Sequence, residues 1–283
     1  MSAIATVLLA SSVLAAPAIA APFFFSTGNP DGKMATAARP VTGGAFEIES
    51  ADDFILTSGT RIDTATFTGL LPSGSTANNV KSVVVEVYRV FPKDSDVGRT
   101  SGPPTFSTSQ VPTRVNSPSD VALLSRESGS TLSFTTQLLD DNFTASNTVQ
   151  PGGIHPLPGI FTGGDGPVTG DEVQFNIDFT QPILLGADHF FFVPQVELDN
   201  GNFLWLSAPR PILPPGTPFM GDLQSWTRDP FLDPDWLRIG TDITHEGPFN
   251  ATFSLTGEIP EPGTITLLLG VIAALGWKVR KRT

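Results

Sequence analysis

Acidic side chains in turn-forming stretches are the residues of this sequence best suited to chemistry. Hard oxygen ligands on flexible turns suit calcium, which takes about six to eight oxygens. The candidates for such a site are Asp94, Asp96, Asp140, Asp141, Asp165 and Asp171. The EF-hand loop pattern is absent, so two interpretations stay open: a structural calcium ion that bridges loops, or aspartates that only solvate turns. No other cofactor is expected.

Two tryptophans mark a second candidate site. Trp226 and Trp236 stand on either side of Asp229, Asp233 and Asp235 in a Pro-containing segment. Aromatic faces stack on pyranose rings while carboxylates accept hydrogen bonds from hydroxyl groups, so this segment could form a sugar platform. The competing interpretation is that the two rings fix a Pro-rich loop to the core.

Catalytic signatures are missing from the sequence. No Gly-x-Ser-x-Gly elbow is present, and His155, His189 and His245 are far apart and expected at the surface or at strand ends. The chain has no cysteine, which excludes disulfides, thiolate metal ligands and a cysteine nucleophile. Two carboxylates alone can support glycoside hydrolysis. We therefore expect no catalytic residues, with a secreted hydrolase as the remaining enzymatic alternative.

The candidate residues must be positioned by β-strands, because apolar and polar residues alternate over much of the chain. Period two with one polar face is typical of antiparallel strands in a sandwich, and no convincing helical period occurs between the two ends. Strands are expected over 45–56, 61–71, 82–91, 132–138, 173–180, 189–198, 203–206 and 249–256. The sequence therefore predicts an all-β fold, a single antiparallel β-sandwich of jelly-roll type with about eight to ten strands.

Two stretches interrupt this strand pattern. Residues 92–129 are rich in Ser, Thr, Pro and Asp, and a loop of this length inside a domain is usually either functional or disordered. The strand over 189–198 is expected to be central, and Pro194 should mark a bulge or an edge segment in it. Asp199–Asn202 is predicted to form a hairpin turn.

The charge of the chain limits its partners. Asp and Glu number 28 against 16 Lys and Arg, which gives a net charge of −12 at pH 7. The body is more acidic still, because four basic residues lie in the last six positions. Such a field repels nucleic acid and anionic lipid. No nucleic acid partner is expected.

The N-terminal segment, residues 1–20, is similar to a secretory signal peptide. An apolar run over 4–16 is followed by Ala18, Ile19 and Ala20, which fit a small-x-small cleavage site. No Lys or Arg precedes the apolar run, so a true start further upstream stays open, as does a buried Ala-rich helix. The segment predicts a signal helix and export through the general secretion machinery.

The C-terminal segment, residues 258–283, combines three ordered features. Pro260, Glu261 and Pro262 precede the uncharged stretch 265–277, and the chain then ends in the basic residues Lys278, Arg280, Lys281 and Arg282. As a helix, the uncharged stretch would measure about 20 Å, which is short of the ~30 Å hydrocarbon core. A permanent span is therefore marginal, and the basic cluster should stay on the cytoplasmic face.

This order of features resembles the PEP-CTERM sorting signal of Gram-negative bacteria. The resemblance implies recognition by an exosortase, a membrane-embedded cysteine transpeptidase-like protein, and removal of the tail during sorting to the surface or extracellular matrix. It covers only the C-terminal segment, and an ordinary tail anchor with a chance Pro-Glu-Pro is the alternative. The expected organisation is a signal peptide over 1–20, a β-sandwich body over 21–257, and a sorting signal with a hydrophobic helix over 258–283.

The expected function follows from this organisation. The chain should be anchored transiently in the inner membrane and then reside at the cell surface or outside the cell. The resemblance, rather than the strand pattern, suggests a structural or adhesive role in an exopolysaccharide-rich envelope. A carbohydrate-binding β-sandwich module is the alternative, and polysaccharide binding that depends on Trp226 or Trp236 would distinguish it.

Overall fold

The computed structural model describes residues 20–75, 77–98, 114–154, 161–212 and 221–260. The chain divides into two compact units, of which one is Pro22–Ile259 and the other consists of the two terminal segments. The predicted signal helix and the C-terminal hydrophobic helix fall almost wholly outside the described residues. Within the described ranges, no helix is long and apolar enough to span a membrane.

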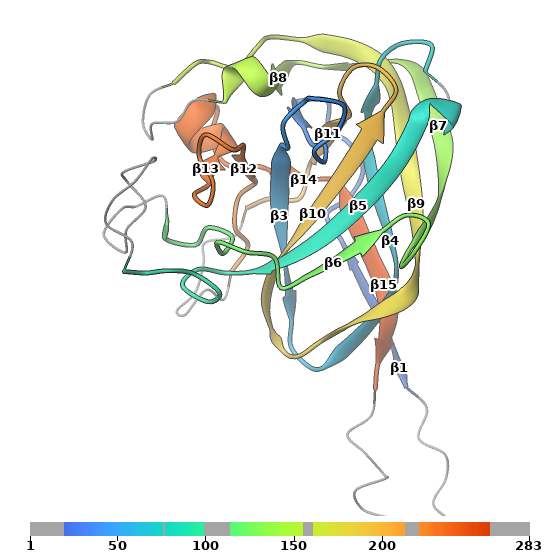
Figure 1. Ribbon diagram of the computed structural model, residues 1–283, viewed down its shortest axis with the longest axis vertical. Helices are drawn as coiled ribbons and strands as arrows, with labels where there is room; N and C mark the ends of the chain where they lie inside the picture. Colours follow the sequence, from blue (N-terminus) through green and yellow to red (C-terminus); the bar gives the residue numbers. More distant parts are fainter. Residues whose placement is uncertain (1–19, 76, 99–113, 155–160, 213–220, 261–283) are drawn as a thin grey trace, which may run out of the picture. The chain divides into compact units, whose positions relative to one another are not determined.

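The described part of the chain is all-β, as predicted, and its strands form two sheets (Figure 1). The nine-stranded sheet contains β1 (Ala21–Ser26), β2 (Met34–Ala37), β4 (Thr60–Leu71), β7 (Ser133–Ala145), β8 (Asn147–Val149), β9 (Val168–Leu185), β11 (Leu204–Ala208), β14 (Asn250–Ala251) and β15 (Phe253–Ile259). The six-stranded sheet contains β3 (Glu49–Leu56), β5 (Val80–Arg89), β6 (Leu124–Glu127), β10 (Asp188–Leu198), β12 (Trp226–Arg228) and β13 (Leu237–Arg238). The helical segments of the described chain are short: η1 (Ala77–Asn79), η3 (Pro151–Gly153) and the π-helical turn η4 (Ile239–Ile243).

Strand β4 organises the nine-stranded sheet. It pairs with β9 along its whole length, and on its other side it pairs first with β15 and then with β11. Strand β9 in turn pairs with β7, and β2 pairs with β8 in parallel. The order of the six-stranded sheet is β13-β12-β3-β10-β5-β6.

The first and last strands of the body are neighbours. β1 and β15 are hydrogen-bonded to one another, and the amide of Thr27, just after β1, donates to the carbonyl of Phe253 at the start of β15 (3.0 Å). The Ala21 end of β1 and the Ile259 end of β15 therefore lie together, as Figure 1 shows. The chain enters and leaves the body at one place.

A core of aromatic rings lies between the two sheets. Phe253 of β15 stacks on Phe192 of β10 with ring centroids 5.0 Å apart and also meets Phe54 of β3 at 6.3 Å, although β15 belongs to the other sheet. Within the nine-stranded sheet, Phe67 stacks on Phe175 at 4.9 Å. These rings are buried, and dispersion and hydrophobic burial hold the sheets together without any disulfide.

The predicted alternation agrees with the observed burial in the central strands. The apolar residues at alternate positions of these strands are in the core: Val83, Val85, Val87, Val173, Phe175, Ile177, Phe179, Ala251, Phe253 and Leu255. Phe249, at the start of the predicted strand 249–256, is only half-buried and packs against a different cluster. Period two in the sequence therefore identified the core face of these strands.

Two local predictions are wrong. The predicted loop over 92–129 contains β6, which pairs with β5 at the sheet edge. Its four residues, LSRE, are too few to show an alternating pattern. The turn Asp199–Asn202 is not a hairpin, because it joins β10 to β11 and these strands belong to different sheets.

Pro194 lies at a local edge inside a central strand. β10 runs between β3 and β5, as predicted, but its pairing with β3 ends at Phe192. The amide of Val196, which has the same orientation as residue 194, donates to Ala38 on the side away from β5 (3.2 Å). The missing N–H of Pro194 therefore costs no hydrogen bond to β5.

The core assignment predicts the effect of truncating its shared ring. We expect Phe253→Ala to lower the free energy of unfolding by about 3–5 kcal/mol, because it removes contacts to both sheets and leaves a cavity. Phe24→Ala, which truncates a ring that is 70% exposed, should cost less than about 0.5 kcal/mol. Urea unfolding measures both, and equal effects would contradict the central position of Phe253.

Candidate functional site

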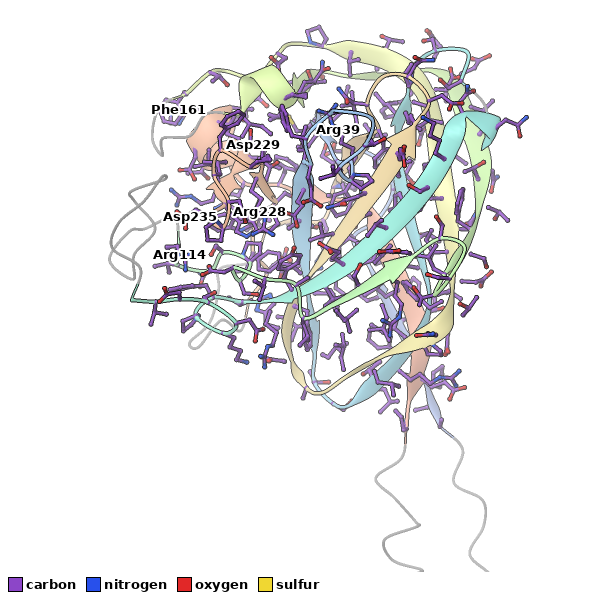
Figure 2. All side chains as sticks on the ribbon, in the orientation of Figure 1. Arg39, Arg114, Phe161, Arg228, Asp229 and Asp235 are labelled. Carbon is purple, nitrogen blue, oxygen red and sulfur yellow. The ribbon has the colours of Figure 1, made fainter. Side chains whose placement is uncertain are left out.

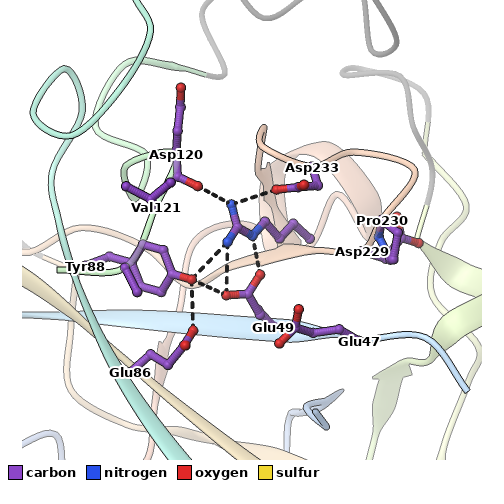
Figure 3. A pocket seen from close by; sticks show the side chains of 11 residues that line it. Glu47, Glu49, Glu86, Tyr88, Asp120, Val121, Asp229, Pro230 and Asp233 are labelled. Atoms are coloured by element: carbon purple, nitrogen blue, oxygen red, sulfur yellow. Dashed lines mark hydrogen bonds and ion pairs between the residues drawn. The ribbon is translucent and has the colours of Figure 1, made fainter. Parts of the chain in front are cut away.

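An acidic pocket of about 350 Å³ lies on the outer face of the six-stranded sheet (Figure 3). The side chains that line it include one arginine, one tyrosine and six carboxylates, namely Glu47, Glu49, Glu86, Asp120, Asp229 and Asp233. Loops around residues 120–122 and 229–233 form its other wall. The pocket therefore combines a rigid sheet floor with loop walls.

Strand alternation places the floor residues. On β5, Val85 and Val87 point into the core, so Glu86 and Tyr88 point to the opposite face of the sheet. Glu49 begins β3 and lies directly opposite Arg228, the last residue of β12. Cross-strand neighbours have their side chains on the same face, which brings this arginine and this glutamate together.

Arg228 is the hub of the pocket. Its guanidinium forms a bidentate ion pair with Glu49, and its Nη2 also donates to the hydroxyl of Tyr88 at 2.9 Å. Its Nη1 donates to the carbonyl of Asp120 at 2.9 Å and lies 3.3 Å from an Asp233 carboxylate oxygen. The guanidinium also lies 4.4 Å from the ring centroid of Trp236. Because all of these interactions are internal, little of the positive charge is left for an anionic ligand.

The tyrosine hydroxyl has more partners than its one proton can serve. It lies 2.5 Å from Glu49 Oε1 and 2.9 Å from Glu86 Oε2, and it accepts from Arg228. A phenol donates one hydrogen bond, so all three contacts are satisfied when Tyr88 donates to Glu49 and a protonated Glu86 donates to Tyr88. Burial, and then the charge of Glu49, raise the pKa of Glu86 to about 7. Glu86 therefore keeps its proton up to near neutral pH.

Two further carboxyls have too little compensating charge. Burial and the neighbouring Glu49 raise the pKa of Glu47, even though Gln195 Nε2 donates to it at 3.0 Å. Burial raises the pKa of Asp229, which accepts from the amide of Phe231 at 2.9 Å. The pocket is therefore rich in hydrogen-bond acceptors and disfavours anions. A ligand with hydroxyl or ammonium groups suits it.

An exposed aromatic ring follows the pocket wall. Phe231, next to the lining residue Pro230, is 68% exposed and meets Phe46 edge-on at 5.9 Å. Phe46 in turn precedes the lining residue Glu47. An apolar face beside fixed acceptors is the combination that sugar rings use.

The two carboxyl groups of Glu49 and Glu86 are not arranged for glycoside hydrolysis. That reaction needs open space between two carboxyl groups for the scissile bond. Here the hydroxyl of Tyr88 lies between them, and Glu49 is buried and bound to Arg228. This pair is therefore not arranged for cleavage of a glycosidic bond.

The predicted sugar platform on Trp226 and Trp236 is wrong. Each ring is only 1% exposed, and both belong to an apolar cluster on the outer face of the six-stranded sheet. Trp236 Nε1 donates to the carbonyl of Ser119 at 3.1 Å, so its ring fixes a loop to the sheet, as the competing interpretation held. Asp229 and Asp233 do line the pocket, but Asp235 is buried and pairs with Arg114 at 2.6 Å. Figure 2 labels Arg114, Asp235 and Arg228 on the same side of the body.

The six aspartates considered for a calcium site do not form one cluster. Among the described residues, no group of three or more His, Cys, Asp or Glu side chains could hold a metal ion. Asp94 binds Arg89, which lowers the pKa of Asp94, and Asp141 is exposed. The others accept hydrogen bonds from backbone amides: Asp96 from Gly98, Asp140 from Asn142, Asp165 from Gln150, and Asp171 from Gly74. Asp140 and Asp141 lie within β7 and Asp171 within β9, rather than in the expected turns, and the six side chains make separate local contacts.

A second group of acidic residues is buried beside the apolar cluster. Asp53 Oδ2 lies 2.5 Å from His189 Nε2, and its Oδ1 accepts from the amide of Leu223 at 2.8 Å. Burial raises the pKa of Asp53 to about 6, against the opposing effect of His189. Asp52 accepts from Ser225 and Ala251, and its pKa is raised by burial. His189 is near a strand end as predicted, but it is buried rather than exposed.

The residues of the processing signals lie at or beyond the limits of the described chain. Ala20 and Pro260 are its first and last residues. Ala18 and the remaining sorting-signal residues, Glu261, Pro262, Lys278, Arg280, Lys281 and Arg282, lie outside it. These predictions stay predictions.

Sequence reasoning missed the centre of the pocket. Glu49 and Arg228 are 179 positions apart, and no local pattern links them. One available indication was that Tyr88, the only tyrosine of the chain, shares the polar face of a strand with Glu86.

Comparisons of the chain with protein-family models, curated proteins and solved structures find no match.

The raised pKa values predict how stability depends on pH. Glu86 has an ordinary value of 4.5 and a folded value of about 7, so the folded state binds its proton more tightly. This contribution to stability is complete below pH 4.5 and is lost as pH rises to about 7. In Glu86→Gln, the free energy of unfolding should decrease by about 2 kcal/mol less between pH 4.5 and pH 7 than in the parent protein. Asp53 should leave a separate decline that ends near pH 6.

Urea titrations at several pH values between 4 and 8 test this expectation. Glu127→Gln, at an exposed position of β6, is the control and should keep the decline of the parent protein. A parent protein whose free energy of unfolding rises from pH 5 to pH 7 would contradict the proton assignment.

Proposed function

We propose that this chain is an exported surface or matrix protein with a structural or adhesive role in an exopolysaccharide-rich envelope, sorted by an exosortase. The observation that carries the adhesive part is the acidic pocket with the exposed Phe231 beside it. Its acceptor groups and apolar ring suit a hydroxyl-rich polymer. In the carbohydrate-binding alternative, the acidic pocket takes the place of the two buried tryptophans as the binding site. Carbohydrate binding by this pocket would then be the basis of the adhesive role.

The limits of the body support the proposed processing. β1 begins at Ala21, directly after the proposed signal cleavage at Ala20, and β15 ends at Ile259, directly before the Pro-Glu-Pro sequence. Cleavage at either position would leave every described strand intact. The proposed partners are the secretion machinery, an exosortase, the inner membrane as a transient anchor, and an exopolysaccharide.

The finer description of the fold belongs to the same proposal. We infer one jelly-roll-like β-sandwich, because rings from both sheets meet in one core cluster. In addition, the chain crosses between the sheets at short connections, such as the one between β3 and β4. In such a sandwich each sheet has one outer face, and the acidic pocket lies on that of the six-stranded sheet.

Sorting is tested with the full chain in a Gram-negative host that has an exosortase. We expect export and loss of the tail, and Glu261→Ala should retain the tail because it removes the charged residue of the proposed recognition sequence. Mass spectrometry of the cell-surface and membrane fractions measures both ends. An intact polypeptide in the cytosol, uncut at residues 20 and 261, would refute the sorting proposal.

Glycan binding is tested independently, on a glycan array and by retention on exopolysaccharide from the same host. Phe231→Ala should weaken binding about two- to tenfold, because an aromatic stacking contact contributes roughly 0.5–1.5 kcal/mol. Glu47→Gln, as a second single variant, should also weaken binding, because it replaces one carboxylate acceptor of the pocket by an amide. Phe24→Ala, which removes an equally exposed ring on β1, should leave binding unchanged. Absence of any retained glycan would remove the adhesive role of the pocket while leaving sorting untouched.

A further inference from the structure

Strand β7 is a long strand at an edge of the nine-stranded sheet. It has 13 residues, and within the described chain its only pairing partner is β9. Figure 1 shows it along the outer side of β9. Its outward row of N–H and C=O groups can therefore pair with another strand.

The two halves of β7 differ in how they are protected. Ser133–Leu138 pairs with β9 residue by residue without a shift, and it contains neither a charge nor a proline. Beyond Leu138 the register shifts twice, and Asp140 and Asp141 are exposed. Charges and irregular register are the features that prevent edge-to-edge association. The first half lacks both.

Apolar side chains accompany the unprotected half. Leu138 is 58% exposed and Leu139 44% exposed. Phe134, on the same face as Leu138, is half-buried, and its ring lies 6.3 Å from that of Phe175 in the core. An added strand would extend this partly open end of the core.

We propose that Phe134–Leu138 pairs antiparallel with the same segment of a second copy of this chain, with a two-fold axis at Thr136. Copies related by an axis perpendicular to the sheet keep the same face inward, so residues of equal parity must lie opposite one another. This register places Phe134 of each copy opposite Leu138 of the other, an aromatic–aliphatic pair on each side of the axis. The nine-stranded sheets of the two copies become continuous.

The uncharged segment permits this occupant and this register. The chain carries a net charge of −12, so two copies can approach closely only through a patch without charge, and residues 128–139 carry none. In the proposed register, Asp140 and Asp141 lie beyond the paired segment of the other copy and do not face one another. Strong association should therefore persist, and increase slightly, as salt screens the remaining repulsion.

Single-cysteine variants test the register, because the chain has no cysteine of its own. The full chain is kept in a mild non-ionic detergent, so that the apolar stretch 265–277 does not drive association. Thr136→Cys should form a disulfide-linked dimer under mild oxidation, since the two positions are directly opposite. Thr144→Cys, on the same strand beyond the aspartates, should not, since its two copies would be far apart. Equal cross-linking of both, or of neither, overturns the proposal.

Sedimentation equilibrium tests the contact without cysteine. The parent chain should be a dimer at micromolar concentration, and Leu138→Lys should raise the dissociation constant at least about tenfold by opposing a charge to Phe134 of the other copy. Val41→Lys changes a 72%-exposed valine in a turn and should leave the dimer intact. A parent chain that is monomeric at about 100 μM, or a dimer that Leu138→Lys does not weaken, also overturns the proposal.

Discussion

The buried ion pair between Arg228 and Glu49 determines the arrangement of the outer face of the six-stranded sheet. Both residues are nearly inaccessible, at 6% and 4% exposure, so neither charge can be left without its partner. The pair fixes β12 to β3, orients the hydroxyl of Tyr88, and holds the carbonyl of Asp120 from a loop on the opposite wall. The acidic pocket is the space that remains around this pair. Its excess of carboxylates follows from the fact that one arginine neutralises one glutamate.

The sequence predicted those parts of the structure that depend on neighbouring residues. The alternation in 82–91, 173–180 and 249–256 identified the strands and their core faces, because side-chain direction in a strand reverses at every residue. The edge strand β6 and the connection at Asp199–Asn202 were misassigned, because pairing partners depend on the whole sheet rather than on local pattern. The predicted sugar platform on Trp226 and Trp236 is wrong for a related reason. The same composition of Trp, Asp and Pro is compatible with an exposed platform or with a buried loop anchor. The choice depends on whether the two rings find an apolar cluster to pack against, and here they do.

The acidic composition has a different meaning in the folded body than in the sequence. A net charge of −12 suggests a uniformly negative surface, yet several carboxyls are removed from water. Asp52, Asp53, Glu47 and Glu86 all have pKa values raised chiefly by burial. Because their protonated forms are favoured in the fold, these four carboxyls make the folded state less stable as the pH rises through their pKa values. Acid here stabilises groups that would otherwise be buried charges.

The adjacency of β1 and β15 determines how the body would respond to mechanical tension. A force that separates the two chain ends would peel β1 from β15, and their hydrogen bonds would break one after another at low force. A force applied through the C-terminal end alone acts along β15 against β4, where six residue pairs must slide together. A load between the last strand and the rest of the body therefore acts on β15 and β4 in shear, whereas a body pulled at both ends would unzip.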